Sequence, residues 1–80
     1  MLNVTIISPQ KMIFKGEAKS VILPGEKGIF EILPFHKPFL SRLIAGELIV
    51  DERSFTIRRG VLKADHGSVT AVVEGVEATS

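Results

Sequence analysis

Histidine, serine and aspartate supply a base, a nucleophile and an orienting carboxylate for hydrolysis, and this chain contains all three types. His36, Ser41 and Asp51 would form such a trio on paper. The chemistry requires the nucleophile to lie within hydrogen-bond reach of the base, which a third group must hold in place. No spacing in the sequence brings the three residues together. We therefore interpret His36 as a loop histidine and predict no catalytic site.

Asp65 and His66 are the adjacent acid–imidazole pair of the chain. A metal site needs two or three histidine or carboxylate ligands at helical or hairpin spacing. Here the pair stands alone and Gly67 follows it, which is typical of a turn. The sequence has no cysteine, so disulfides and thiolate zinc sites are excluded. We predict neither a metal nor a cofactor.

The segment Gly25-Glu26-Lys27-Gly28 has the glycine and lysine content of a phosphate-binding loop. Such a loop needs a lysine and a serine or threonine after its second glycine, at the start of a helix. In this chain Lys27 precedes Gly28 and no hydroxyl residue follows. The segment is therefore expected to be a plain connection between strands.

Basic and apolar side chains offer two possible binding surfaces. Arg58 and Arg59 lie close in sequence to Arg53 and Lys63, which leaves open either an ordinary solvated face or contact with an acidic partner. The net charge is only +1, so there is no electrostatic case for nucleic acid. Exposed apolar residues are the better indication of function.

Ile29 and Phe35 are the apolar residues that we expect at the surface. If Phe30 and Ile32 face the core, alternation turns Ile29 away from it, and Phe35 falls within a loop. Large apolar side chains on loops at the end of a β-domain often mark a binding surface. The competing possibility is that the loop folds back and buries them.

Alternating apolar and polar residues dominate the chain and predict strands. The expected strands lie over residues 2–6, 12–14, 20–23, 29–33, 47–50, 55–57, 61–64 and 69–73, with 39–44 left open between a strand and one helical turn. Turns are expected at Pro24-Gly25, Asp51-Glu52 and Asp65-Gly67, with a bend or bulge at Gly16 and a break between strands at Gly60. About eight to ten short, mostly antiparallel strands predict an all-β fold, a small sandwich or flattened barrel.

Eighty residues predict one domain over 1–80, with residues 75–80 as a frayed tail. No run approaches the roughly 20 apolar residues that span a bilayer. The start of the chain, Met1–Thr5, lacks the basic and apolar regions of a secretory signal, so a cytoplasmic location is the default expectation.

A series of short motifs, none specific alone, follows in a fixed order. They are Leu23-Pro24-Gly25, Gly28, Leu33-Pro34-x-His36-x-Pro38-Phe39-Leu40, Leu43, Gly46 and Phe55-x-Ile57-x-x-Gly60-Val61-Leu62. In this order and spacing they resemble the epsilon subunit of F-type ATP synthases, called delta in mitochondria. The resemblance extends over residues 2–78 without long gaps.

The resemblance implies a non-catalytic rotor subunit that packs on gamma in the central stalk and rests on the ring of c subunits. Ion-driven rotation would pass through it to ATP synthesis. By position in the family, Glu26, Lys27, Ile29 and Glu31 are expected to face the polar loops of the c-ring, and His36, Phe39 and Ser41 to face gamma. The location implied for a bacterial protein is peripheral, on the cytoplasmic face of the inner (plasma) membrane. No membrane insertion and no nucleic acid are implied.

Two departures from the family pattern matter. Phe35 stands where the family usually has glycine, so the local backbone is expected to avoid positive φ. The family sandwich also continues into a helical hairpin that inhibits ATP hydrolysis and can bind ATP, and the resemblance does not extend to that hairpin. Neither property is therefore expected of residues 1–80.

A small β-barrel that binds peptide or single-stranded nucleic acid is the alternative interpretation. Binding of single strands needs aromatic side chains interleaved with basic ones on an exposed face. The chain has five phenylalanines, of which Phe14, Phe30 and Phe55 are expected in the core. The sequence therefore favours the rotor subunit.

Overall fold

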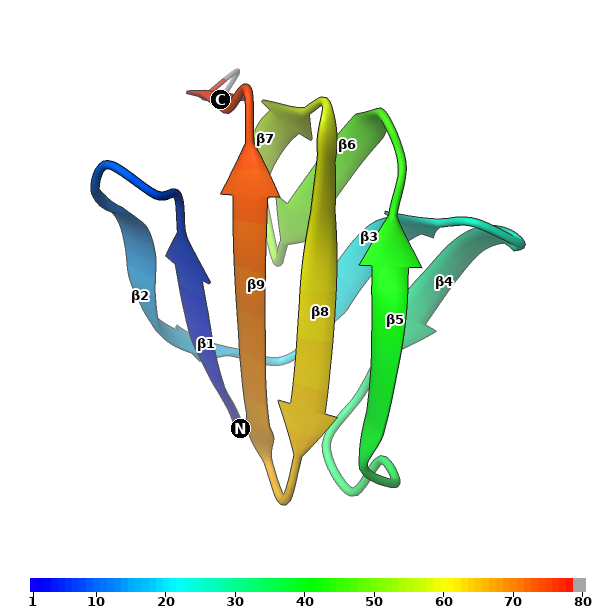
Figure 1. Cartoon of the computed structure of the whole chain (residues 1–80). Helices are drawn as coiled ribbons and strands as arrows, with labels where there is room; N and C mark the ends of the chain where they lie inside the picture. The colour runs from blue at the N-terminus through cyan, green and yellow to red at the C-terminus, as the bar shows by residue number, and fades with distance from the viewer. Residues whose placement is uncertain (79–80) are drawn as a thin grey trace.

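The computed structural model describes residues 1–78 as ten strands in one strongly curled sheet (Figure 1). The strands are β1 (Leu2–Ile7), β2 (Met12–Ala18), β3 (Val21–Gly25), β4 (Gly28–Ile32), β5 (Phe39–Leu43), β6 (Gly46–Val50), β7 (Arg53–Ile57), β8 (Arg59–Asp65), β9 (Ser68–Glu74) and β10 (Glu77–Ala78). Within residues 1–78 no helix is long and apolar enough to cross a membrane.

The curled sheet folds over itself into two layers. One layer has the order β5-β8-β9-β1-β2, and the other runs β10-β7-β6-β3 with β4 on the far edge of β3. The layers meet where Gly25 of β3 pairs with Leu43 of β5. Figure 1 shows β5, β8 and β9 in front of β3, β6 and β7. Strands β1 and β9 pair in parallel and the other pairs are antiparallel, which confirms the predicted all-β, mostly antiparallel fold.

The core lies between the two layers, because apolar residues at alternate positions of each strand point inward. The inward residues of β1, β8 and β9 are buried, as are those of the facing strands; the largest fully buried side chains are Leu2, Ile6, Leu23, Ile32, Leu48, Ile57 and Leu62. Each open side of the sandwich carries a pair of phenylalanines. Phe14 and Phe55 have ring centroids 6.0 Å apart on one side, and Phe30 and Phe39 lie 5.9 Å apart on the other. Aromatic contacts therefore bridge the layers where backbone pairing does not.

The Pro24-Gly25 turn was predicted wrongly. Both residues belong to β3, where they pair with Ile29 and Gly28 of β4, and the turn is at Glu26-Lys27. Gly25 is needed for close packing, because a Cβ there would lie 2.7 Å from the Phe30 ring. Pro24 and Gly25 therefore form the closely packed end of β3 and not a turn.

The bend or bulge predicted at Gly16 and the break predicted at Gly60 are also wrong, since both glycines lie inside paired strands in regular register. The register shift occurs at Ile6/Ile7 in β1, and the interruption before β8 falls at Arg58. Pairing with a neighbouring strand decides these positions, and a single sequence does not carry that information.

The two remaining uncertain segments are both strands where the structure describes them. Residues 39–43 form β5 through full pairing with β8, which settles the open choice between strand and helical turn. Within the tail expected to fray over 75–80, Glu77 and Ala78 form β10 and pair with Thr56 and Phe55. Val76 packs against the core as well. Residues 79 and 80 lie outside the described residues.

Asp51, in the turn between β6 and β7, ties that turn to the connection between β2 and β3. Its Oδ1 accepts hydrogen bonds from the backbone N–H of Lys19 at 3.0 Å and of Ser20 at 3.2 Å, and its own N–H donates to the Ser20 carbonyl. Its φ is +53°, a region that asparagine and aspartate tolerate better than most residues.

We expect Asp51→Ala to lower the free energy of unfolding by about 1–2 kcal/mol, because two backbone donors lose a charged acceptor. Asp51→Asn keeps an acceptor oxygen and should lose less than half of that. Urea unfolding followed by circular dichroism measures both, with Glu52→Ala in the same turn as the control. Equal urea midpoints for Asp51→Ala and Glu52→Ala would contradict this role.

Candidate functional site

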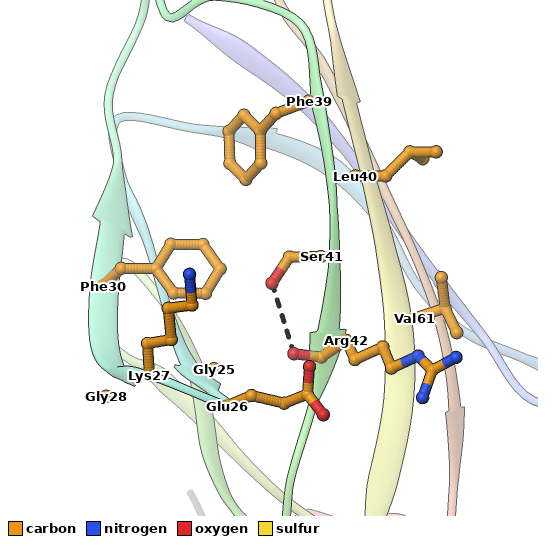
Figure 2. Close-up of a pocket in the computed structure, with 10 residues that line it drawn as sticks. All are labelled: Gly25, Glu26, Lys27, Gly28, Phe30, Phe39, Leu40, Ser41, Arg42 and Val61. Carbon is orange, nitrogen blue, oxygen red and sulfur yellow. Dashed lines mark hydrogen bonds between the residues drawn. The ribbon is translucent and has the colours of Figure 1, made fainter.

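An apolar groove lies between β4 and β5, on the side of the sandwich bridged by Phe30 and Phe39. It has a volume of about 670 Å³ and is lined by Gly25, Glu26, Lys27, Gly28, Phe30, Phe39, Leu40, Ser41, Arg42 and Val61. Figure 2 shows the Phe30 ring reaching from β4 and the Phe39 ring from β5 into the space between these strands, with Ser41 on β5 and Glu26 at the lower end. We call this feature the β4–β5 groove.

The β4–β5 groove brings together residues that the family resemblance assigned to two different partners. Glu26 and Lys27, expected to face the c-ring, lie in the exposed turn at one end. Phe39 and Ser41, expected to face gamma, lie on the β5 wall. Members of both predicted sets therefore line the same groove.

Ile29 and Glu31 lie on the opposite face of β4 from Phe30. Ile29 is 79% exposed, which agrees with the expectation from alternation. It lines a separate hollow of about 600 Å³ together with Ile44, Glu47 and Ile49, on the outer face of β3, β4 and β6. The predicted c-ring set is thus divided between the β4–β5 groove and this outer face.

His36 lies in the loop between β4 and β5, beside the groove. Its Nδ1 is 3.2 Å from the Leu33 carbonyl oxygen, and its ring stands edge-on to Phe39 with centroids 6.2 Å apart. Nε2 is buried and has no hydrogen-bond partner among residues 1–78. His36 therefore fixes the loop against Phe39, which itself forms the groove wall.

Phe35 is fully exposed and has a φ of +72°, so the expectation that this loop avoids positive φ is wrong. Pro34 and Phe35 occupy the two middle positions of a turn. Proline suits the first of these in a type II turn, and that turn type requires positive φ at the second. The loop keeps the backbone that glycine would adopt, and the phenylalanine bears a strain of about 1–2 kcal/mol. The alternative in which the loop buries this ring is excluded.

The residues considered for catalysis point to separate partners. The Ser41 hydroxyl donates to the Arg42 carbonyl at 3.2 Å, Asp51 accepts from the backbone at Lys19 and Ser20, and His36 contacts Leu33. Among residues 1–78, no group of three acidic, histidine or cysteine side chains is placed to hold a metal ion. His36, Ser41 and Asp51 therefore do not form the trio that hydrolysis would need.

The arginines do not form one basic patch. Arg59 on β8 makes an ion pair with Glu74 on the neighbouring strand, and the Arg53 guanidinium on β7 lies 5.6 Å from the centre of the Phe14 ring on β2. Each has a local partner, so the alternative of a joint acidic-partner surface has no support.

Leu40, Arg42 and Val61 also line the groove, although the sequence did not predict them as site residues. Leu40 is 72% exposed, and Val61 is exposed on β8, where it pairs with Arg42. Leu40 and Val61 could have been recognised as apolar residues on the polar side of the alternation. This pattern was hidden because the segment 39–44 could not be assigned as a strand from its own residues.

The chain matches a family model described as the β-sandwich domain of the ATP synthase delta/epsilon chain, over residues 1–79. It is 38% identical to an ATP synthase epsilon chain from Bordetella parapertussis over 78 residues, covering 91% of this chain and 56% of that protein. It is 37% identical to one from Nitratiruptor over 79 residues, covering 92% and 61%. The chain thus spans little more than half the length of these relatives.

Two solved assemblies contain similar folds. One is the Euglena gracilis mitochondrial ATP synthase, described as OSCP, F1 and c-ring, in which one chain matches with a TM-score of 0.89 at 18% identity. That match covers 96% of this chain and 52% of the other. The other is the central stalk and c-ring of the Tetrahymena thermophila enzyme, with a TM-score of 0.77, 17% identity and coverage of 95% and 65%. At these identities the likeness concerns the fold.

Proposed function

The chain belongs to the ATP synthase delta/epsilon family through its β-sandwich domain, and from this membership we propose that it is a non-catalytic central-stalk subunit of an F-type ATP synthase. In this role it packs on gamma and on the polar loops of the c-ring, and it helps to couple ion-driven rotation to ATP synthesis. The observation that carries the proposal is the family match over residues 1–79, together with relatives named ATP synthase epsilon chain.

The surface of the described residues suits this role. A rotor element must transmit torque without deforming, and the sandwich has a closed core with aromatic contacts between its layers. The β3–β4 hairpin projects between the β4–β5 groove and the outer hollow around Ile29. We propose that Glu26, Lys27, Ile29 and Glu31 contact the c-ring and that His36, Phe39 and Ser41 contact gamma.

The proposed location follows from the proposed partners. A bacterial protein in this role would be attached through the complex to the cytoplasmic face of the inner membrane, without insertion of its own. The net charge of +1 and the scarcity of exposed rings give the nucleic-acid alternative no support.

We expect Ile29→Asp and Phe35→Asp each to weaken assembly with the gamma–c-ring complex tenfold or more. In each variant a carboxylate would replace an apolar side chain that is buried in the proposed interface. Both side chains are exposed in the free protein, so the melting temperature should change by no more than a few degrees. Met12→Asp is the matched control, since Met12 is 54% exposed on β2, at the opposite edge of the layers. Pull-down and surface plasmon resonance measure the assembly.

Two results would argue against the proposal. Unfolding of both aspartate variants would mean that these side chains serve the core. Tight binding of single-stranded oligonucleotides at low salt, without affinity for gamma, would favour the small binding module instead.

A further inference from the structure

Strand β5 has one edge that the described residues leave almost entirely unpaired. Its other edge pairs with β8 over the whole strand, from Phe39 opposite Ala64 to Leu43 opposite Gly60. On the open edge, β3 reaches only Leu43, through Gly25, before the chain turns away at Glu26-Lys27. Unpaired strand edges of this kind are templates for another strand.

The direction of the backbone groups on this edge can be established from two hydrogen bonds. The Ile44 N–H donates to the Pro24 carbonyl at 2.8 Å, so the backbone of Ile44 points away from β8. Backbone direction alternates along a strand, so Arg42 and Leu40 point the same way. The Arg42 carbonyl does accept from the Ser41 hydroxyl on that edge, as the dashed line in Figure 2 shows. Leu40 and Arg42 therefore present backbone groups to the β4–β5 groove.

The groove beside this edge fits the side chains of an added strand. The rings of Phe30 and Phe39, which contact each other, line it, and Leu40 adds exposed apolar surface. Among the charged residues that line it, Lys27 and Arg42 are cations and Glu26 is the one carboxylate. A strand with apolar residues at alternate positions and a net negative charge is complementary to it.

We propose that the β4–β5 groove receives one extended strand of a partner protein, which adds to the open edge of β5 through the backbone of Leu40 and Arg42. The inference rests on the proposed function, in which this partner is gamma. The bonded segment would be about four or five residues long, to match the five residues of β5. Main-chain hydrogen bonds would then give affinity, and the ring-lined walls would select the side chains.

Substitution by proline at Arg42 tests the backbone contact directly. Arg42→Pro removes an N–H that points away from β8, a position at which edge strands accept proline. Arg42→Ala is the matched control, because it removes the side chain and keeps the N–H. We expect gamma to bind Arg42→Pro at least tenfold more weakly than wild type, and Arg42→Ala no more than about threefold more weakly. Thermal melts establish that both variants are folded.

Hydrogen exchange on the wild-type complex provides a second measurement that does not depend on a variant's folding. The amides of Leu40 and Arg42 should exchange at least tenfold more slowly when gamma is bound, while the amide of Glu52, in the turn at the end of β6, should not change. Docking through side chains alone would leave the two β5 amides unprotected.

The outcomes separate this inference from the proposed function. If gamma binds Arg42→Pro as tightly as wild type and the amides stay unprotected, strand addition is wrong and the stalk role stands. If gamma does not bind the wild-type chain at all, strand addition and the stalk role are both wrong. If the amides become protected on self-association of the chain, measured by sedimentation without gamma, a second copy occupies the groove and the assignment to gamma is wrong.

Discussion

Leu62→Ala is expected to lower the free energy of unfolding by about 3 kcal/mol or more, within the range seen when a buried leucine is truncated. Leu62 has no exposed surface and lies in the middle of β8, between Ser41 of β5 and Ala71 of β9. Removing its side chain leaves a cavity between the layers, and the paired strands on both sides restrict its collapse. In a domain of this size such a loss is a large part of the total stability.

Val61→Ala is the control for this substitution, because Val61 is adjacent in sequence and points to the opposite, exposed face. It should cost well under 1 kcal/mol. Urea unfolding of both variants measures the difference, and equal midpoints would show that the center of the core lies elsewhere. Because β8 carries β5, the Leu62 variant should also exchange the β5 amides faster, which hydrogen exchange can detect.

Local alternation was sufficient to predict the strands whose one face is buried. Val69, Ala71 and Val73 are all inward and buried, and Phe55 and Ile57 likewise. A shift of the strand pairing by one residue would turn these buried side chains to solvent. The apolar alternation therefore also fixes the pairing register. For such strands the sequence alone carries enough information.

Local sequence was insufficient where a distant strand decides the geometry. Pro24 and Gly25 are typical turn residues, yet pairing with Ile29 and Gly28 keeps them in a strand. Phe35 has a strong preference against positive φ, yet the turn after β4 imposes it. For Pro24 and Gly25 tertiary pairing outweighs the turn preference, whereas for Phe35 the turn that begins at Pro34 outweighs a backbone preference of about 1–2 kcal/mol.

The candidate site was predictable only in part, for the same reason. The exposure of Ile29 follows from alternation within β4, and the structure confirms it. The β4–β5 groove arises where strands from both layers leave an unpaired edge, and this depends on contacts far apart in sequence. Glu26 and Phe39 were assigned to separate partners by their positions in the family, and their positions along the chain gave no sign that they line the same groove.

Gly60→Ala is expected to destabilise the fold by about 3 kcal/mol, at the upper end of the range for overpacking. A Cβ on Gly60 would lie 2.6 Å from the Val72 carbonyl oxygen and 3.0 Å from Val73 Cγ1. The first of these is backbone in a central strand, so no side-chain rotation can relieve the clash. Strand β8 must separate from β9, and β5, which pairs with β8, must move with it.

Gly16→Ala provides the contrast, because Gly16 also lies in a paired strand and a Cβ there would approach nothing closer than the end of the Phe14 ring at 3.2 Å. A flexible ring can move by a few tenths of an ångström, so this variant should stay within about 1 kcal/mol of wild type. Thermal and urea unfolding measure the pair of variants. If both keep wild-type stability, the close approach of β8 to β9 is not required. If Gly60→Ala is folded but binds gamma more weakly, the position of β5 beside the β4–β5 groove depends on this approach, which links packing in the center of the sheet to the proposed partner surface at its edge.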